Sequence, residues 1–105
     1  MRRIDLTDYE TEVLTEDGIK TIPYNVKESI DLAMYHPDLK LGWRELFEND
    51  RVAQKIKSAN GSVLLEESEY TSIKRVFETI QGFRKQDLEL VRRVLEAPKV
   101  EVTER

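Results

Sequence analysis

The chain has 105 residues, no cysteine, one histidine and a net charge of −4. This length predicts a single small domain, residues 1–105. The absence of cysteine excludes disulfides, thiolate metal sites and cysteine nucleophiles. No apolar run approaches the ~20 residues of a membrane helix, and the N-terminus lacks the apolar stretch of a signal peptide. We therefore expect a soluble, cytoplasmic protein that binds no membrane and no cofactor.

Charge is distributed unevenly along the chain. Residues 1–50 hold 6 basic and 12 acidic side chains, and residues 51–105 hold 11 basic and 9 acidic ones, so the halves carry −6 and +2. Such asymmetry suits a molecule that docks head to tail or that presents a basic face to an anion. An ordinary solvated surface is the other interpretation, because acids and bases are interleaved in the second half.

The N-terminal part is predicted to form a β-hairpin over about residues 4–23. Apolar and polar residues alternate from Ile4 to Leu14, as they do in a half-buried strand. The alternation slips by one residue near Asp8. This slip indicates either a bulge or a later start of the strand.

The turn of this hairpin is predicted at Asp17-Gly18. This dipeptide between alternating segments is a strong hairpin signal, because both central positions of a type I′ turn need positive φ. Such a turn places Thr15 opposite Lys20. Pro23 lacks an N–H and is expected to end the second strand.

Four helices are predicted from apolar residues that recur every three to four positions. Asn25 and Glu28 have the spacing of a capping box at the start of the first helix. Pro37 disfavours helical geometry at the preceding residue and so ends that helix, and Pro98 stops the last one. The predicted ranges are 26–35, 43–59, 66–81 and 86–96.

Two short segments complete the predicted fold. Residues 62–65 fit either a brief buried strand or the entry into the next helix. The alternation Val100-Glu101-Val102 fits a strand over about 99–103 that could pair with the hairpin. The fold class is therefore α+β: an N-terminal hairpin, with a C-terminal third strand as an option, packed against three to four helices.

Few residues offer material for catalysis. His36 is the only histidine, and before Pro37 at a helix end it is expected to be a turn residue. One histidine without cysteine leaves almost no ligands for zinc or copper, and no glycine-rich nucleotide-binding motif occurs. We therefore expect no enzymatic activity.

Two aromatic residues, Trp43 and Phe83, stand next to glycines at element boundaries, outside the predicted core stripes. Exposed aromatic residues of this kind are typical interface anchors, although residues that cap the edge of a core fit the same pattern. Together with Arg84, Arg92 and Arg93 they are the predicted interaction residues, for a protein partner or for self-association.

The basic pairs of the C-terminal helices support an alternative function. These helices and their glycine-containing linker could form a helix-turn-helix, in which Lys74, Arg75, Lys85 and Arg92 would contact nucleic acid. Nucleic-acid-binding proteins usually carry an excess of positive charge, whereas this chain is net negative. A protein-interaction module is therefore the preferred prediction, and a small nucleic-acid-binding regulator is the alternative.

Three segments resemble small proteins encoded by tailed bacteriophages and prophages. They are Val63-Leu64-Leu65-Glu66-Glu67-Ser68-Glu69-Tyr70, the stretch from Gly82 to Val102, and the N-terminal Ile4-Asp5-Leu6-Thr7-Asp8-Tyr9-Glu10. The resemblance implies an accessory or assembly role. It assigns no site residue.

Overall fold

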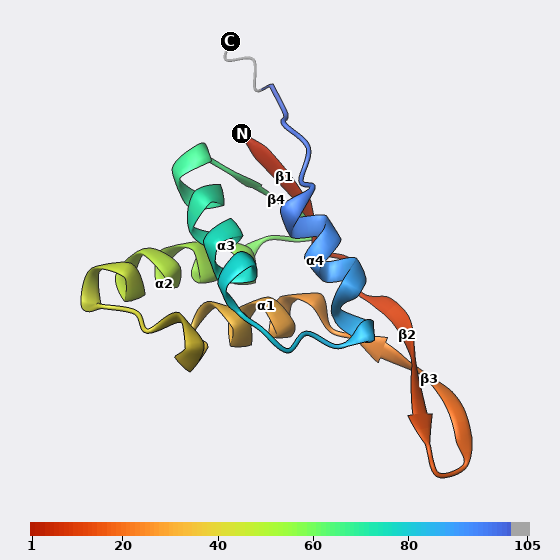
Figure 1. Cartoon of the computed structure of the whole chain (residues 1–105). Coiled ribbons are helices and arrows are strands. Elements are labelled where there is room, and N and C mark those ends of the chain that lie inside the picture. The colour runs from red at the N-terminus through yellow and green to blue at the C-terminus, as the bar shows by residue number, and fades with distance from the viewer. Residues whose placement is uncertain (102–105) are drawn as a thin grey trace.

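A computed structural model describes residues 1–101 of the chain (Figure 1). Its elements are β1 (Arg2–Asp5), β2 (Tyr9–Thr15), β3 (Gly18–Tyr24), α1 (Val26–Met34), the 3-10 turn η1 (Pro37–Leu39), α2 (Trp43–Ser58), β4 (Ser62–Leu65), α3 (Glu67–Thr79), the 3-10 turn η2 (Lys85–Asp87) and α4 (Leu88–Leu95). The predicted α+β class is confirmed. Within the described residues, no helix is long and apolar enough to cross a membrane.

The predicted helices are confirmed, with ends that differ from the expected ones by at most two residues. The Asn25 side chain caps α1 by accepting a hydrogen bond of 3.0 Å from the backbone N–H of Glu28. Residues 62–65, whose sequence left two interpretations open, form strand β4. The fourth helix is the shortest because its predicted first turn is partly the 3-10 turn η2.

The N-terminal strand and the hairpin are separate, so the predicted hairpin range of 4–23 is wrong at its start. β1 pairs antiparallel with β4, and Ile4 lies opposite Val63. After β1 the Asp5 carboxylate accepts hydrogen bonds from both the backbone N–H and the hydroxyl of Thr7, at 2.9 and 2.7 Å. This local turn interrupts the extended chain and explains the slip in alternation near Asp8.

The hairpin turn also differs from the prediction. Its two loop residues are Glu16 and Asp17, neither of which has positive φ, and Gly18 follows with φ +112°. Thr15 therefore lies opposite Gly18 rather than Lys20. Only the glycine takes the conformation that a type I′ turn would have required of Asp17 as well.

The C-terminal segment runs beside β1 and not beside the hairpin. The backbone N–H of Arg3 donates to Pro98 O at 3.1 Å, and that of Val100 donates to Met1 O at 2.8 Å. The predicted strand over 99–103 is reduced to a single bridge between Arg2 and Lys99, and residues 102 and 103 lie outside the described part. β1 is thus enclosed between β4 and the segment after α4.

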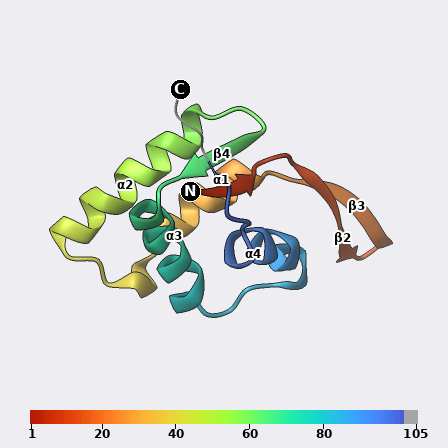
Figure 2. The same ribbon diagram turned by 90° about the horizontal axis from the view of Figure 1, so that it is seen from above.

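One hydrophobic core forms between the β1–β4 sheet and the four helices (Figure 2). Its largest fully buried side chains are Ile4, Ile30, Met34, Ile56, Leu65, Ile73 and Leu90. No residue from 9 to 24, all of which the structure describes, is buried. The hairpin projects from the helical body as an arm, and we call residues 9–24 the arm (Figure 1).

A matched pair of leucine substitutions tests this division between body and arm. Leu65 on β4 is 0% exposed and Leu14 on the arm is 85% exposed. Leu65→Ala should lower the free energy of unfolding by about 2–5 kcal/mol through the cavity that it leaves. Leu14→Ala should change it by less than about 0.5 kcal/mol. Urea denaturation of both variants measures the difference, and a large loss with Leu14→Ala would contradict a free arm.

Candidate functional site

The base of the arm is fixed to the start of α4 by two tyrosines. Tyr9 and Tyr24 are cross-strand partners whose rings stack with centroids 4.7 Å apart. The Tyr9 hydroxyl donates to Gln86 O at 2.7 Å, and the Tyr24 hydroxyl donates to Asp87 Oδ1 at 2.5 Å. We call these four residues the clamp.

Arg93 of α4 reinforces the clamp from the other side of the Tyr9 ring. Its guanidinium lies 5.1 Å from the ring centroid and donates to Thr7 O at 2.6 Å. It also pairs with Glu89 at 3.2 Å and lies 3.9 Å from an Asp5 oxygen. With its side chain only 15% exposed and its Nε and Nη1 atoms engaged, Arg93 acts as an anchor between α4 and the connection from β1 to the arm.

Beyond its base the arm carries large apolar side chains that the rest of the described chain leaves uncovered. Leu14 and Ile19 are opposite each other beside the turn, and they are 85% and 69% exposed. Ile22 is also exposed, on the opposite face of the arm. These exposed apolar side chains make the arm a candidate interaction surface.

A groove of about 590 Å³ lies where the arm meets α4, and we call it the arm-base groove. One wall is formed by residues 9–12 of the arm, and the other by residues of η2 and α4. The lining residues are Tyr9, Glu10, Thr11, Glu12, Lys85, Gln86, Leu88, Glu89, Arg92 and Arg93. Its three acidic and three basic side chains balance, so the groove as a whole attracts neither anions nor cations.

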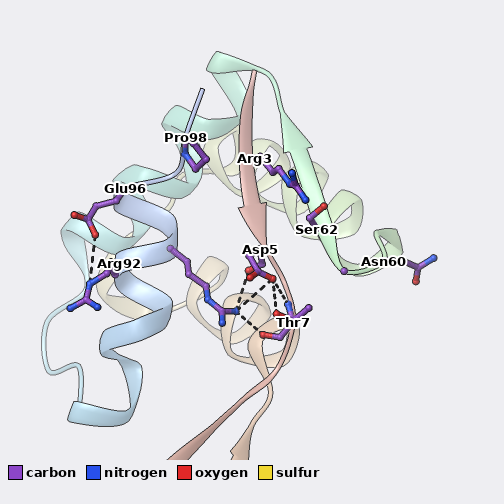
Figure 3. A pocket seen from close by; sticks show the side chains of 10 residues that line it. Arg3, Asp5, Thr7, Asn60, Ser62, Arg92, Glu96 and Pro98 are labelled. Atoms are coloured by element: carbon purple, nitrogen blue, oxygen red, sulfur yellow. Dashed lines mark hydrogen bonds and ion pairs between the residues drawn. The ribbon is translucent and has the colours of Figure 1, made fainter. Parts of the chain in front are cut away.

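A second groove, of about 690 Å³, lies further along the same face of α4, against β1 (Figure 3), and shares Arg92 and Arg93 with the arm-base groove. Arg3 extends from β1 toward Ser62, whereas Arg92 points away from the strands beside Glu96. Arg92 lies 3.7 Å from both Glu89 and Glu96. Because the arginines diverge and Arg92 is already paired, this groove does not concentrate positive charge.

The structure brings together only some of the residues predicted for interaction. Arg92 and Arg93 both line the arm-base groove, and Phe83 and Arg84 lie in the linker that enters η2. Phe83 is 37% exposed and stacks on Phe77 at 5.7 Å, as a residue at the core edge does. Trp43 is 65% exposed at the start of α2, on the opposite side of the body from the arm (Figure 1).

The residues predicted for nucleic-acid contact are divided between two places. Lys85 and Arg92 line the arm-base groove beside three carboxylates, whereas Lys74 and Arg75 are exposed on α3 outside that groove. In addition, the clamp occupies the N-terminal end of α4, the end that a helix-turn-helix inserts into the major groove.

Metal-binding clusters are absent from residues 1–101. No three histidine or acidic side chains in this range are placed to hold a metal ion. His36 has the turn role expected from the sequence, since its Nδ1 accepts a hydrogen bond of 3.1 Å from the backbone N–H of Asp38.

Sequence analysis missed the arm tip as a candidate site. An alternating pattern predicts a strand with one buried face, which would hide either Val13 or Leu14. The neglected signal is that apolar residues occupy both faces near the turn, at Val13 and Leu14 and again at Ile19 and Ile22. A two-stranded arm can bury neither face by itself.

Comparison of the chain with protein-family models, with curated proteins and with solved structures found no match. The candidate site therefore rests on its own geometry.

All four tyrosines have a raised pKa. Burial is the main cause at each of them. At Tyr24 and Tyr35 a hydrogen bond to an aspartate adds to it, and raises the pKa of Tyr35 to about 12. The neutral phenol is thus the form that the folded state favours.

Removing the Tyr24 hydroxyl should loosen the base of the arm. Tyr24→Phe should lower the free energy of unfolding by about 1.5–3 kcal/mol, the value of a hydrogen bond to a charged group. It should also speed hydrogen exchange of arm amides near the base. Tyr35→Phe is the matched control, because its hydroxyl donates to Asp50 at 2.6 Å on α2. Equal exchange in the arm of both variants would contradict the clamp.

The raised tyrosine pKa values predict a loss of stability in alkali. An unfolded tyrosine ionises near pH 10, whereas the folded chain resists ionisation. The free energy of unfolding should therefore be unaffected by tyrosine below about pH 10 and should fall as the pH rises toward about 12. Urea denaturation at a series of pH values measures this slope. A Tyr24→Phe/Tyr35→Phe variant should show a shallower slope, and an unchanged slope would contradict the assignment.

Proposed function

We propose that this chain is a non-enzymatic protein-interaction module and that the arm is its binding element. The observation that carries the proposal is the exposed apolar pair of Leu14 and Ile19 at the end of a projecting, anchored hairpin. A protein partner that covers this pair removes apolar area from water, at about 25 cal/mol per Å².

The weak intrinsic stability of such a hairpin supports the proposal. An isolated two-stranded hairpin is marginally stable in water, and a third strand or a packed face normally supports it. The arm has such support at its base, through the clamp, but not along residues 10–23. A partner that packs against the arm would supply the missing layer.

The resemblance to phage-encoded proteins supplies a biological setting for the proposal. An accessory or assembly factor of a phage or prophage would act inside the host cell, in the cytoplasm, through binding to another protein or to itself. Capsid or tail genes beside the gene for this chain would support that setting. A chromosomal neighbourhood without phage genes would count against it.

Charged substitutions at the arm tip test the function. Leu14→Glu/Ile19→Glu places two carboxylates in the apolar contact and should reduce binding of a protein partner, or of a second copy, by at least about tenfold. The fold should be preserved because neither side chain belongs to the core. Leu32→Glu on α1 is the matched control, since Leu32 is as exposed as Ile19, at 69%.

The measurement has two parts. Proteins captured by the immobilised chain from cells that express it naturally are compared among the wild type, the arm variant and the control. Protection of residues 10–23 from hydrogen exchange is then measured with any protein whose capture depends on the arm. Capture that is equal for all three chains, together with an unprotected arm, would overturn the proposal.

A further inference from the structure

We infer that the partner of the arm is a second copy of this chain, in a two-fold symmetric dimer in which each arm tip enters the arm-base groove of the other copy. This inference rests on the proposed function and names the occupant of the arm.

The edges of the arm are protected against simple strand addition. β2 carries Glu10 and Glu12, so two β2 edges placed together would repel each other. β3 carries Pro23, which lacks an N–H, and Lys20, and both residue types discourage edge pairing. The arm therefore binds through its tip and faces rather than by extending a sheet.

The tip and the groove have complementary chemistry. The tip combines the apolar Leu14 and Ile19 with the carboxylates of Glu16 and Asp17. Asp17 has only a long contact of 4.0 Å to Lys20, and Glu16 has no ion pair within residues 1–101.

The charges of the groove balance as a whole, but its η2 end, where Lys85 and Leu88 line it, offers the counterparts of these groups. Leu88 is a large exposed apolar side chain in the groove wall, and Lys85 lies beside it. Arg84 directly precedes Lys85, and neither side chain makes a hydrogen bond or ion pair with another described residue. Asp87, the nearest carboxylate in sequence, is already bonded by Tyr24 and by the backbone N–H of Arg84.

The positions of tip and groove on one chain satisfy two-fold symmetry. Each strand of the arm has seven residues, which span roughly 20 Å at about 3.3 Å per residue. The groove lies at the base of the arm and the tip at its far end. Two arms placed antiparallel therefore bring each tip to the other base, and both contacts form at once, as in an isologous interface.

The antiparallel alignment of the two arms also places further residues of one copy at the same height as residues of the other copy. Lys20 pairs with Val13 within its own arm, so it comes level with Glu12 of the other copy. The Leu14–Ile19 pair comes level with residues 11 and 12, the part of the arm that shares the groove with Leu88.

A reciprocal charge exchange tests the inference in the full chain. Variant one is Glu16→Lys/Asp17→Lys, in the tip, and variant two is Arg84→Glu/Lys85→Glu, at the groove. Each variant alone places like charges at both contacts, whereas a mixture of the two places opposite charges at both. A matched control, Asp31→Lys/Glu48→Lys, makes the same charge change as variant one on exposed positions of α1 and α2.

Sedimentation equilibrium measures the outcome, with circular dichroism to establish that each variant is folded. The wild type and the control should form dimers with a Kd of about 10 µM, as expected for a small interface. Each charge variant alone should dimerise at least about tenfold more weakly. An equimolar mixture of the variants should recover the wild-type affinity as a heterodimer.

Three results would overturn the inference. They are a wild-type chain that remains monomeric to about 500 µM, a dimer that neither charge variant weakens, and a mixture of variants that fails to recover. A monomeric chain that binds a different protein through Leu14 and Ile19 would overturn the dimer while supporting the proposed function. If neither a second copy nor any other protein binds through Leu14 and Ile19, both the dimer and the proposed function would be overturned.

Discussion

The stacked pair of Tyr9 and Tyr24 is the contact on which the placement of the arm depends. Both rings lie at the point where the hairpin leaves the body, and their hydroxyls donate hydrogen bonds to adjacent residues, Gln86 and Asp87. The Asp8 carboxylate adds a third link by accepting from the backbone N–H of Val26, at 2.9 Å, directly after the arm returns. A hairpin held at its base in this way keeps its direction while its tip stays accessible, so the proposed partner would meet a pre-organised surface and less ordering entropy would be lost on binding.

The clamp also links the arm to the order of the whole chain. Arg93 holds the connection between β1 and the arm through Thr7 O, while the segment after α4 runs beside β1. α4 therefore contacts the arm at its first turn and adjoins β1 at its last, and a shift of this helix would move both. Because Leu90 and Val94 fix α4 in the core, the direction of the arm is set by core packing as much as by its own turn.

Sequence reasoning succeeded where the structure is governed by local periodicity. The four helices bury stripes of residues three and four positions apart, such as Tyr70, Ile73 and Phe77 of α3, and that spacing is visible in the chain. It failed where the position of an element depends on a partner that is distant in sequence. Ile4 is buried because β1 pairs with β4 nearly 60 residues later, and alternation alone could not distinguish this partner from the hairpin. The candidate site, too, was only partly predictable from the sequence. Arg92, Arg93 and Lys85 were identified by their charge, but Arg93 proved to be an anchor, and the arm tip was hidden by the assumption that alternation implies burial.

The composition of the arm gives two opposing constraints. Large apolar side chains at an exposed tip are a hazard for aggregation, and an unpaired hairpin edge is a template for further strands. The chain retains Leu14 and Ile19 at the tip yet places glutamates along β2 and Pro23 in β3. Replacing the apolar pair with polar residues would remove the hazard without loss to the core, because neither side chain belongs to it. An apolar tip beside protected edges is therefore the arrangement that the proposed binding through the tip requires, because it leaves the tip free for a contact while the edges discourage strand addition.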